Sequence, residues 1–177
     1  TMMFGDQTDA AEAARIVAAT RDAGLNAIDT ADAYANGESE RIVGRLIAAD
    51  RERWVVATKL ANPTSADAND RGLSRRHMLR ALDGSLARLD TDRVEILYLH
   101  REDATTPLEE TVAAMAHLLA SGKVLYTLAR TNGGPNPPHD SIPVFLLVQL
   151  TDDTHLLSEA FSARSSDFTA AARHWVR

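Results

Sequence analysis

The chain has 177 residues, 45% of them hydrophobic and 25% charged, and a formal net charge of −6. These values are typical of one soluble globular domain, and an acidic balance without a Lys/Arg block argues against nucleic acid or a membrane surface as a partner. The sequence contains no cysteine and no apolar run of roughly 18 residues, so it excludes thiolate chemistry and predicts a cytoplasmic protein that acts on a small molecule.

The beginning of the chain alternates between helix and strand signals. Residues 1–5 have the composition of the middle of a strand, so we expect further sequence upstream. Asp9 is the predicted N-cap of the helix that follows, and Gly24 ends it. A strand is expected over residues 26–29. The next helix has one apolar face, formed by Ile42, Val43, Leu46 and Ile47.

Another strand and helix follow the same alternation. A strand over residues 54–59 leads into residues 61–73, which are rich in Asn, Asp, Pro and Ser and which we predict to be an active-site loop. Ser74 is the expected N-cap of the third helix, and a strand follows over 94–99. Apolar side chains at three- and four-residue steps give that helix its buried face: Leu79, Leu82, Leu86 and Leu89.

The fourth helix has the strongest start signal in the sequence. Thr106 is its predicted N-cap, Pro107 its first helical residue and Glu109 its capping-box partner. Its predicted buried face consists of Leu108, Val112, Met115 and Leu119. The alternation of strands and helices as far as Val124, with short crossovers, predicts a parallel sheet in an α/β fold.

The regular pattern ends near Leu128. Residues 133–138 are rich in Gly and Pro and exclude regular structure there. Beyond them we expect a strand over Val144–Leu150 and a weak helix over Ser158–Trp175. Residues 133–177 therefore form a tail separate from the regular part, residues 1–132.

Three of the predicted strands end in an ionisable residue: Asp29, Lys59 and His100. The carboxyl ends of parallel strands meet at one edge, where α/β folds carry their chemistry, and Tyr34 follows the first of them. A tyrosine hydroxyl, with a pKa of about 10, needs a neighbouring cation to act as an acid or base at neutral pH. Lys59 is the candidate cation, Asp29 its counter-charge and His100 a hydrogen-bond donor to a substrate oxygen. These groups suit protonation of a carbonyl oxygen, and because no side chain supplies hydride they imply a nicotinamide cofactor.

Each of these residues also has a structural interpretation. Asp29 can open a turn, Tyr34 can cover the end of the sheet, Lys59 can extend to solvent from a strand end, and His100 can be a hydrogen-bonded packing residue. Four other carboxylates have the same ambiguity. Asp32 and Asp103 are expected near the same edge of the sheet, where each is a candidate site residue or a turn residue. Glu38 and Glu40 are expected to begin a helix.

The stretch GLNAIDTADAY at residues 24–34, followed by GESE at 37–40, resembles the first signature of the aldo-keto reductases. The segments LHRED (99–103) and TPLEET (106–111) resemble the part of that family that carries its catalytic histidine, and Thr58-Lys59 resembles its lysine strand. The resemblance extends over about residues 1–126. It implies a (β/α)8 TIM barrel that reduces aldehydes and ketones with NADPH, with Tyr34 as general acid, Lys59 and Asp29 as its tuning pair and His100 orienting the carbonyl.

The resemblance weakens at the predicted fifth strand. Residues 122–126 still match, and Thr131-Asn132 stands where the family has a Ser-Asn pair that holds the nicotinamide carboxamide. The resemblance thus assigns cofactor contacts to Asp29, Thr131 and Asn132. The segments that bind the adenosine phosphate and the pyrophosphate have no counterpart. We therefore expect an incomplete (β/α)8 barrel of about four to five βα units and an irregular tail, and we hypothesise a truncated or frame-shifted gene product.

Two functions follow from this sequence. The first is NADPH-dependent reduction of an aldehyde or ketone, with the activity of a shortened chain left open. The second is a non-catalytic barrel fragment that associates through its open sheet edge, because about five strands cannot close a barrel. Residues 144–148 are candidates to cover that edge, and self-association is the other way to cover it. A metal-dependent enzyme is disfavoured, since the histidines lack the spacing of metal ligands.

Overall fold

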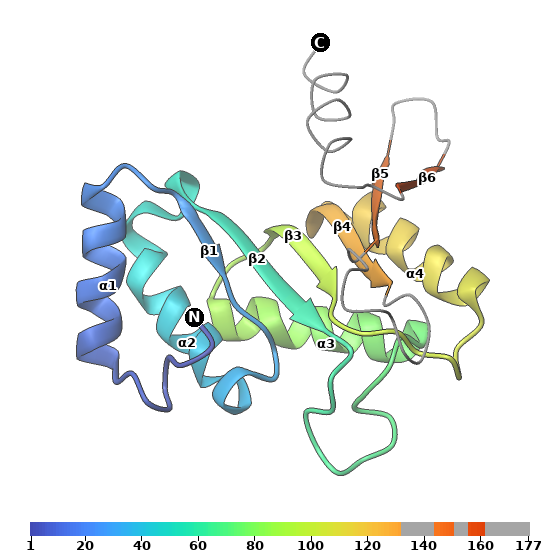
Figure 1. The fold of residues 1–177 in the computed structure, drawn as a ribbon, viewed down its shortest axis with the longest axis horizontal. Coiled ribbons are helices and arrows are strands. Elements are labelled where there is room, and N and C mark those ends of the chain that lie inside the picture. Colours follow the sequence, from blue (N-terminus) through green and yellow to red (C-terminus); the bar gives the residue numbers. More distant parts are fainter. Residues whose placement is uncertain (132–143, 151–155, 162–177) are drawn as a thin grey trace.

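The computed structural model describes residues 1–131, 144–150 and 156–161. Figure 1 shows strands and helices following one another across the molecule in chain order. The elements are α1 (Ala10–Asp22), β1 (Ala27–Asp29), the 3₁₀ helix η1 (Tyr34–Gly37), α2 (Glu38–Ile47), the 3₁₀ segment η2 (Ala48–Arg53), β2 (Val55–Leu60), α3 (Arg75–Leu89), β3 (Val94–Leu99), α4 (Leu108–Ala120), β4 (Val124–Thr131), β5 (Val144–Leu150) and β6 (Leu156–Phe161).

The described strands form one sheet in the order β1-β2-β3-β4-β5-β6. The pairs from β1 to β4 are parallel, which confirms the predicted α/β architecture. The strand β5 pairs antiparallel with β4 and has Leu147 opposite Leu128, so the predicted strand at 144–150 does cover the edge of β4.

The predicted helix over Ser158–Trp175 is wrong for its first four residues, Ser158–Phe161. These residues belong to β6, which pairs antiparallel with β5 and has Ser158 opposite Val148. A strand edge such as that of β5 presents unpaired backbone groups, and pairing with a neighbouring segment satisfies them more directly than a helix does. The remainder of that predicted helix, 162–175, lies outside the described residues.

The start of the chain also differs from the prediction. Residues 1–5 do not form a strand, because the Thr8 amide donates to the Met3 carbonyl at 2.9 Å and the Phe4 amide to the Thr1 carbonyl at 2.9 Å. These local turns leave a single isolated bridge, between Phe4 and Thr8. Gly5, with φ of +83°, permits the reversal.

Helix α4 begins one residue later than predicted. Its N-cap is Pro107, without a side-chain cap, because the hydroxyl of Thr106 donates instead to the Asp103 carboxylate at 2.7 Å. Leu108 is 68% exposed and is not part of the buried face. The buried face is instead formed by Thr111, Ala114, Met115, Leu118 and Leu119.

The helix starts at Asp9 and Ser74 are confirmed. Asp9 accepts the Glu12 amide at 2.8 Å, and Ser74 accepts the His77 amide at 3.3 Å. The apolar faces of α2 and α3 pack into one core with the sheet, and Gly44 of α2 lies directly against the Leu89 backbone of α3. None of the described helices is both long and apolar enough to cross a bilayer.

The alternation along β2 decides where the candidate site lies. Val56, Thr58 and Leu60 are buried, and Thr58 contacts Glu40 of α2, so this face of the strand meets the helices. Lys59 belongs to the other face, where its ammonium lies 5.9 Å from the ring centroid of Tyr98 on β3. Successive side chains of a strand point to opposite faces, which separates Lys59 from the helix layer.

Candidate active site

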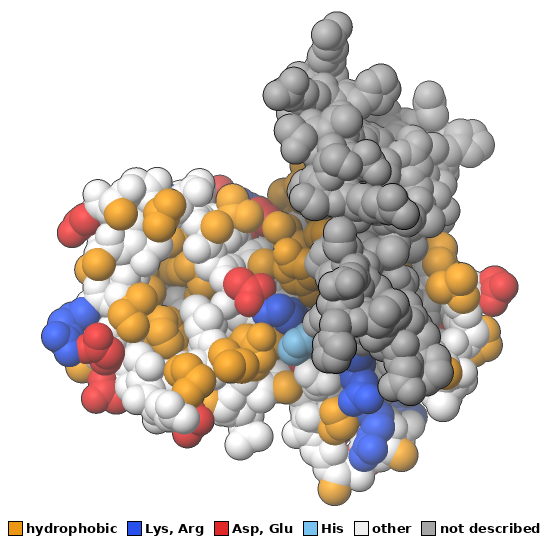
Figure 2. Space-filling model, viewed as in Figure 1, with side chains coloured by type: hydrophobic (Ala, Val, Ile, Leu, Met, Phe, Trp, Pro, Cys, Tyr) orange, Lys and Arg blue, Asp and Glu red, His pale blue; other side chains and the backbone are white. Residues whose placement is uncertain are grey.

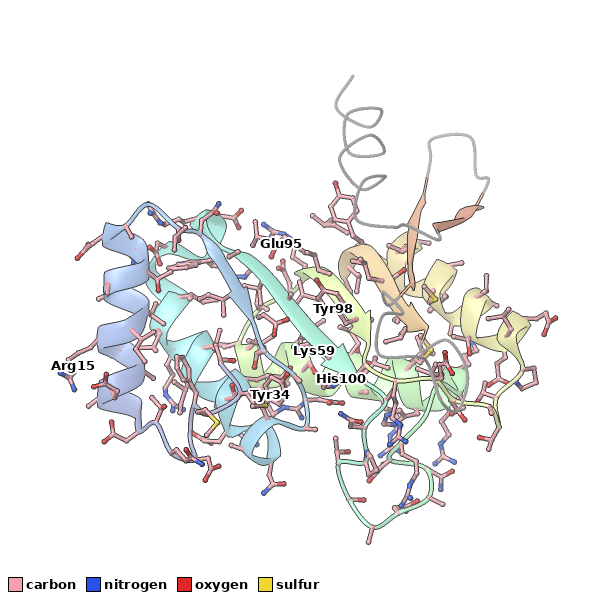
Figure 3. All side chains as sticks on the ribbon, viewed as in Figure 1. Arg15, Tyr34, Lys59, Glu95, Tyr98 and His100 are labelled. Atoms are coloured by element: carbon pink, nitrogen blue, oxygen red, sulfur yellow. The ribbon has the colours of Figure 1, made fainter. Side chains whose placement is uncertain are left out.

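The carboxyl ends of β1, β2 and β3 bring Asp29, Lys59 and His100 to one edge of the sheet. Parallel pairing sets Asp29 opposite Ala57 and Lys59 opposite Tyr98, so the strand ends coincide. Figure 3 shows Tyr34, Lys59 and His100 gathered at this edge, far from Glu95 at the other end of the strands. In the space-filling view, an acidic, a basic and a histidine surface lie next to one another among hydrophobic side chains (Figure 2).

Lys59 is the centre of this group. Its ammonium donates to the Tyr34 hydroxyl at 3.2 Å, to the Thr30 carbonyl at 2.8 Å and to the Asp29 carboxylate, which also forms an ion pair with it. Three acceptors match the three protons of an ammonium group. The Lys59 side chain is 13% exposed, whereas that of Asp29 is 53% exposed. The ammonium is therefore fixed beside the Tyr34 oxygen, where a positive charge stabilises negative charge on that oxygen.

The backbone holds Tyr34 close to Lys59. The amides of Thr30 and Asp32 donate to the carbonyls of Ala57 and Lys59 at 2.9 and 3.0 Å, which continues the β1–β2 ladder past the end of β1. A turn follows, in which the Tyr34 amide donates to the Ala31 carbonyl at 3.2 Å. Tyr34 thus returns over the strand end and points to Lys59 instead of into solvent.

His100 completes the group from β3. Its ring stands edge-on to that of Tyr34, with centroids 6.1 Å apart and planes at 81°. The Asn62 side-chain nitrogen lies 2.9 Å from His100 Nδ1, and an amide nitrogen is a donor, so the neutral ring carries its proton on Nε2. Asn62 belongs to the predicted active-site loop, and nothing in its local sequence marked it as the partner of His100.

The loop over residues 61–73 is fastened beside this group by Asp103. The Asp103 carboxylate accepts the Leu73 amide at 2.8 Å and the hydroxyls of Thr105 and Thr106 at 2.5 and 2.7 Å. Burial opposes the ionisation of Asp103, but these hydrogen bonds outweigh it and hold its pKa well below the usual range. Of the two roles that the sequence allowed for Asp103, the structure therefore favours that of a turn residue.

Residues 1–127 match the model of the aldo/keto reductase family. The chain belongs to this family. A relative from Oryza sativa subsp. japonica, named "Probable voltage-gated potassium channel subunit beta", is 48% identical over 126 residues, and one of the same name from Arabidopsis thaliana is 44% identical over 128 residues. Each match covers 70% of this chain and 38% of the relative, so the matched segment spans well under half of either relative.

Family membership confirms the resemblance predicted over about residues 1–126. Aldo/keto reductases fold as (β/α)8 barrels, and the four parallel strands β1 to β4 with their helices fit an incomplete barrel of that type. A barrel of this kind carries its active site at the carboxyl ends of its strands, the edge at which Tyr34, Lys59 and His100 meet.

The predicted cofactor residues of this aldo/keto reductase lie only partly within the described structure. Asp29 lies at the carboxyl end of β1, and Thr131 is the last residue of β4, the fourth parallel strand. Asn132 lies outside the described residues. The assignment of Thr131 and Asn132 to the nicotinamide stays a prediction.

Beneath the strand ends lies a polar cluster of buried Asp32, Glu40 and Thr58 with the partly exposed Arg88, which the sequence did not indicate as a unit. Glu40 is fully buried and accepts Thr58 Oγ1 at 2.5 Å and Arg88 Nε at 2.6 Å. Asp32 is 3% exposed, and neither of its carboxyl oxygens has a hydrogen-bond partner within the described part of the chain. Burial, followed by the nearby Glu40, raises the pKa of Asp32 to about 7, against a smaller opposing effect of Arg88.

Glu40 was expected only to begin a helix. It does lie in the first turn of α2, but its carboxylate faces the core. A signal for this burial exists in the sequence, because Glu40 precedes Val43 and Ile47 by three and seven residues and so shares their helical face. No comparable pattern in the sequence predicts that Asp32 is buried.

Proposed function

We propose that this chain carries the proton-donating part of an NADPH-dependent reductase of aldehydes or ketones. The observation that carries the proposal is the hydrogen bond of 3.2 Å from Lys59 Nζ to the Tyr34 hydroxyl, with Asp29 on the same ammonium. A cation fixed beside a phenol oxygen equips that phenol to lose its proton to a substrate. The substrate class is then a small carbonyl compound.

In the proposed reaction Tyr34 transfers its hydroxyl proton to the carbonyl oxygen. Lys59 stabilises the resulting phenolate, and Asp29 keeps the ammonium in place. His100, with its proton on Nε2, donates a hydrogen bond to the same carbonyl oxygen and so orients the substrate. When bound, the nicotinamide supplies the hydride to the carbonyl carbon.

The residues at the strand ends suit the reacting end of such a cofactor. The carboxylate of Asp29 is half exposed at the rim and is available to a ligand hydroxyl or amide. Thr131 ends β4 at the same edge of the sheet, within the register that pairs Leu99 with Ala129. We assign Asp29, Thr131 and Asn132 to the nicotinamide end, and we assign none of the described residues to the adenosine phosphate.

Titration with NADPH, followed by a turnover assay with a test aldehyde, tests this proposal. We expect cofactor fluorescence to change on binding and Tyr34→Phe to lower turnover at least about 100-fold, because general acid catalysis contributes that much. Tyr98→Phe is the matched control, since Tyr98 lies on the same face 5.9 Å from Lys59 but outside the proposed proton path. Absence of binding at millimolar NADPH, or full turnover in Tyr34→Phe, would refute the proposal.

Association with a membrane channel is a second candidate function. It is favoured by the two plant relatives, at 48% and 44% identity, that are named as potassium channel beta subunits. We expect the chain to co-purify with a coexpressed voltage-gated potassium channel, with the full-length rice relative as positive control. Loss of the chain during a purification that retains the relative excludes this function.

The non-catalytic alternative is association through an open sheet edge. Strand β1 has β2 as its one neighbour among the described strands, so its other side is the candidate edge. Light scattering distinguishes this alternative, because association through a strand edge gives a concentration-dependent mass. A monomer that reduces aldehydes excludes it.

A further inference from the structure

The buried cluster beneath Tyr34 contains more carboxyl groups than cations. Asp32 and Glu40 lie in it with Arg88, and two carboxylates with one guanidinium leave an uncompensated negative charge in a buried place. Arg88 Nε already bonds Glu40 at 2.6 Å. The positive charge of Arg88 is therefore paired with Glu40. Asp32 has no cation to offset a negative charge, so its protonated, neutral form is favoured.

The groups around Asp32 come from three elements. Glu40 of α2 disfavours its ionisation and Arg88 of α3 favours it, while β2 contributes the uncharged hydroxyl of Thr58 to Glu40. The Ala33 amide favours the carboxylate slightly but does not meet the geometry of a hydrogen bond. None of these contacts supplies the second positive charge that an ionised Asp32 requires.

This cluster encloses the turn that carries Tyr34. Asp32 lies at the start of the turn, Glu40 lies in the first turn of helix α2 after it, and Arg88 packs against it at Gly37, where an added Cβ would lie 2.6 Å from Arg88 Cδ. The turn is also strained, since Ala35 and Asn36 have φ of 47° and 53°. Left-handed conformations at such residues persist only where the surrounding structure enforces them. Arg88 is part of that surrounding structure, because it packs against the turn at Gly37.

We infer that Asp32 is a positioning residue for Tyr34. As a neutral acid it lets the turn over residues 31–37 close on the Glu40–Arg88 pair, and its ionisation displaces the Tyr34 hydroxyl from Lys59. The inference rests on the proposed role of Tyr34 as general acid, but the placement of the Tyr34 ring is measurable without catalysis. It gives the proposed active site a pH dependence that does not originate in the residues that touch the substrate.

Tyrosine-labelled protein tests the inference by carbon NMR. The chain has three tyrosines, and Tyr34→Phe assigns the signal of Tyr34. We expect this signal to move in a step centred near pH 7 and to lose that step in Asp32→Asn, which is permanently neutral. His100 is an ionisable group that faces the Tyr34 ring, so the decisive quantity is the part of the step that Asp32→Asn removes.

Two further variants keep the test decisive if Asp32→Asn folds poorly. Glu40→Gln removes the carboxylate that disfavours ionisation of Asp32, while the positive charge of Arg88, which favours it, remains. The step is therefore expected to move to lower pH by at least about one unit. Glu38→Gln removes a half-exposed carboxylate of the same helix, paired with Arg45 at 3.1 Å, and leaves the step unchanged. A step that is the same in wild type, Asp32→Asn and Glu40→Gln overturns the inference, whether or not the protein binds NADPH. A lost or shifted step with no NADPH turnover refutes the proposed activity alone.

Discussion

The neutral state of Asp32 has a measurable consequence for the stability of the fold. Burial and the nearby Glu40 raise the pKa of this carboxyl from its usual 3.8 to about 7 in the folded protein. At 1.36 kcal/mol per pH unit, the difference corresponds to about 4 kcal/mol of unfolding free energy. This is large beside the stability of an ordinary domain, roughly 5–15 kcal/mol.

The direction of the effect follows from proton binding. Between pH 3.8 and about 7 the folded state keeps the proton of Asp32 while the unfolded state releases it. The unfolding free energy therefore falls as the pH rises through this window. Above it, the contribution of Asp32 to the unfolding free energy no longer changes with pH. In Asp32→Asn this contribution disappears. The variant is thus expected to match the wild type below pH 4 and to exceed its stability by up to about 4 kcal/mol at pH 8.

Urea unfolding at several pH values measures this difference. Trp54 is 2% exposed, so its fluorescence reports the loss of the core. Subtracting the wild-type curve from that of Asp32→Asn removes other titrations, such as that of Asp103, whose depressed pKa acts in the opposite direction. Asp83→Asn is the matched control, because Asp83 is 60% exposed and paired with Lys123. We expect that control to differ from wild type by less than about 1 kcal/mol at every pH.

Parallel stability curves for wild type and Asp32→Asn would refute this reasoning. They would mean that Asp32 has the same proton affinity in the folded and unfolded chain, and hence that the cluster accommodates two ionised carboxylates. A variant that is less stable at pH 8 would refute it as well. Either result would also remove the physical basis for the coupling of Asp32 to Tyr34.

Two further predictions concern the frame around the site. Gly44→Ala is expected to destabilise the fold by about 1–3 kcal/mol in urea unfolding, since its Cβ would overlap the Leu89 backbone. In the control Gly84→Ala the added Cβ would lie 3.2 Å from Arg88 Nη1, a side-chain atom rather than backbone, so the variant is expected to change the stability by less than about 1 kcal/mol. Equal effects of both variants would contradict the packing argument. Asp103→Asn is expected to speed trypsin cleavage in the loop over residues 61–73 about tenfold, because it weakens charge-assisted hydrogen bonds that fasten this loop. An unchanged cleavage rate would show that the loop is held elsewhere.

The sequence predicted the strand ends well because their signals are local. Apolar runs that end in Asp29, Lys59 and His100 need only parallel pairing to meet at one edge, and the alternating helices require such pairing. The start of α4 shows where a local signal fails. Thr106 has the side chain of an N-cap, but its hydroxyl bonds Asp103, whose own position depends on Leu73, 30 residues earlier in the chain.

The polar cluster could not be predicted for the same reason. Glu40 and Arg88 are 48 residues apart in the chain, and only the packing of α2 against α3 makes them partners. Asp32 shows no periodicity that would mark it as buried. A carboxyl between a strand end and a turn is ordinarily exposed. The family motif singles out Asp29 and Tyr34, on either side of Asp32, and gives no indication that Asp32 itself is buried.

Residues 29–40 thus serve two purposes on opposite faces of the same short segment. Asp29 and Tyr34 reach the ammonium of Lys59 at the rim, while Asp32 and Glu40 enter the helix layer beneath. A single turn with a left-handed Ala35 connects the two faces. Because this short turn joins the two faces, the ionisation of Asp32 in the helix layer moves the Tyr34 hydroxyl at the sheet edge. The geometry of the proposed acid and the ionisation of the layer below it are therefore properties of one structural unit.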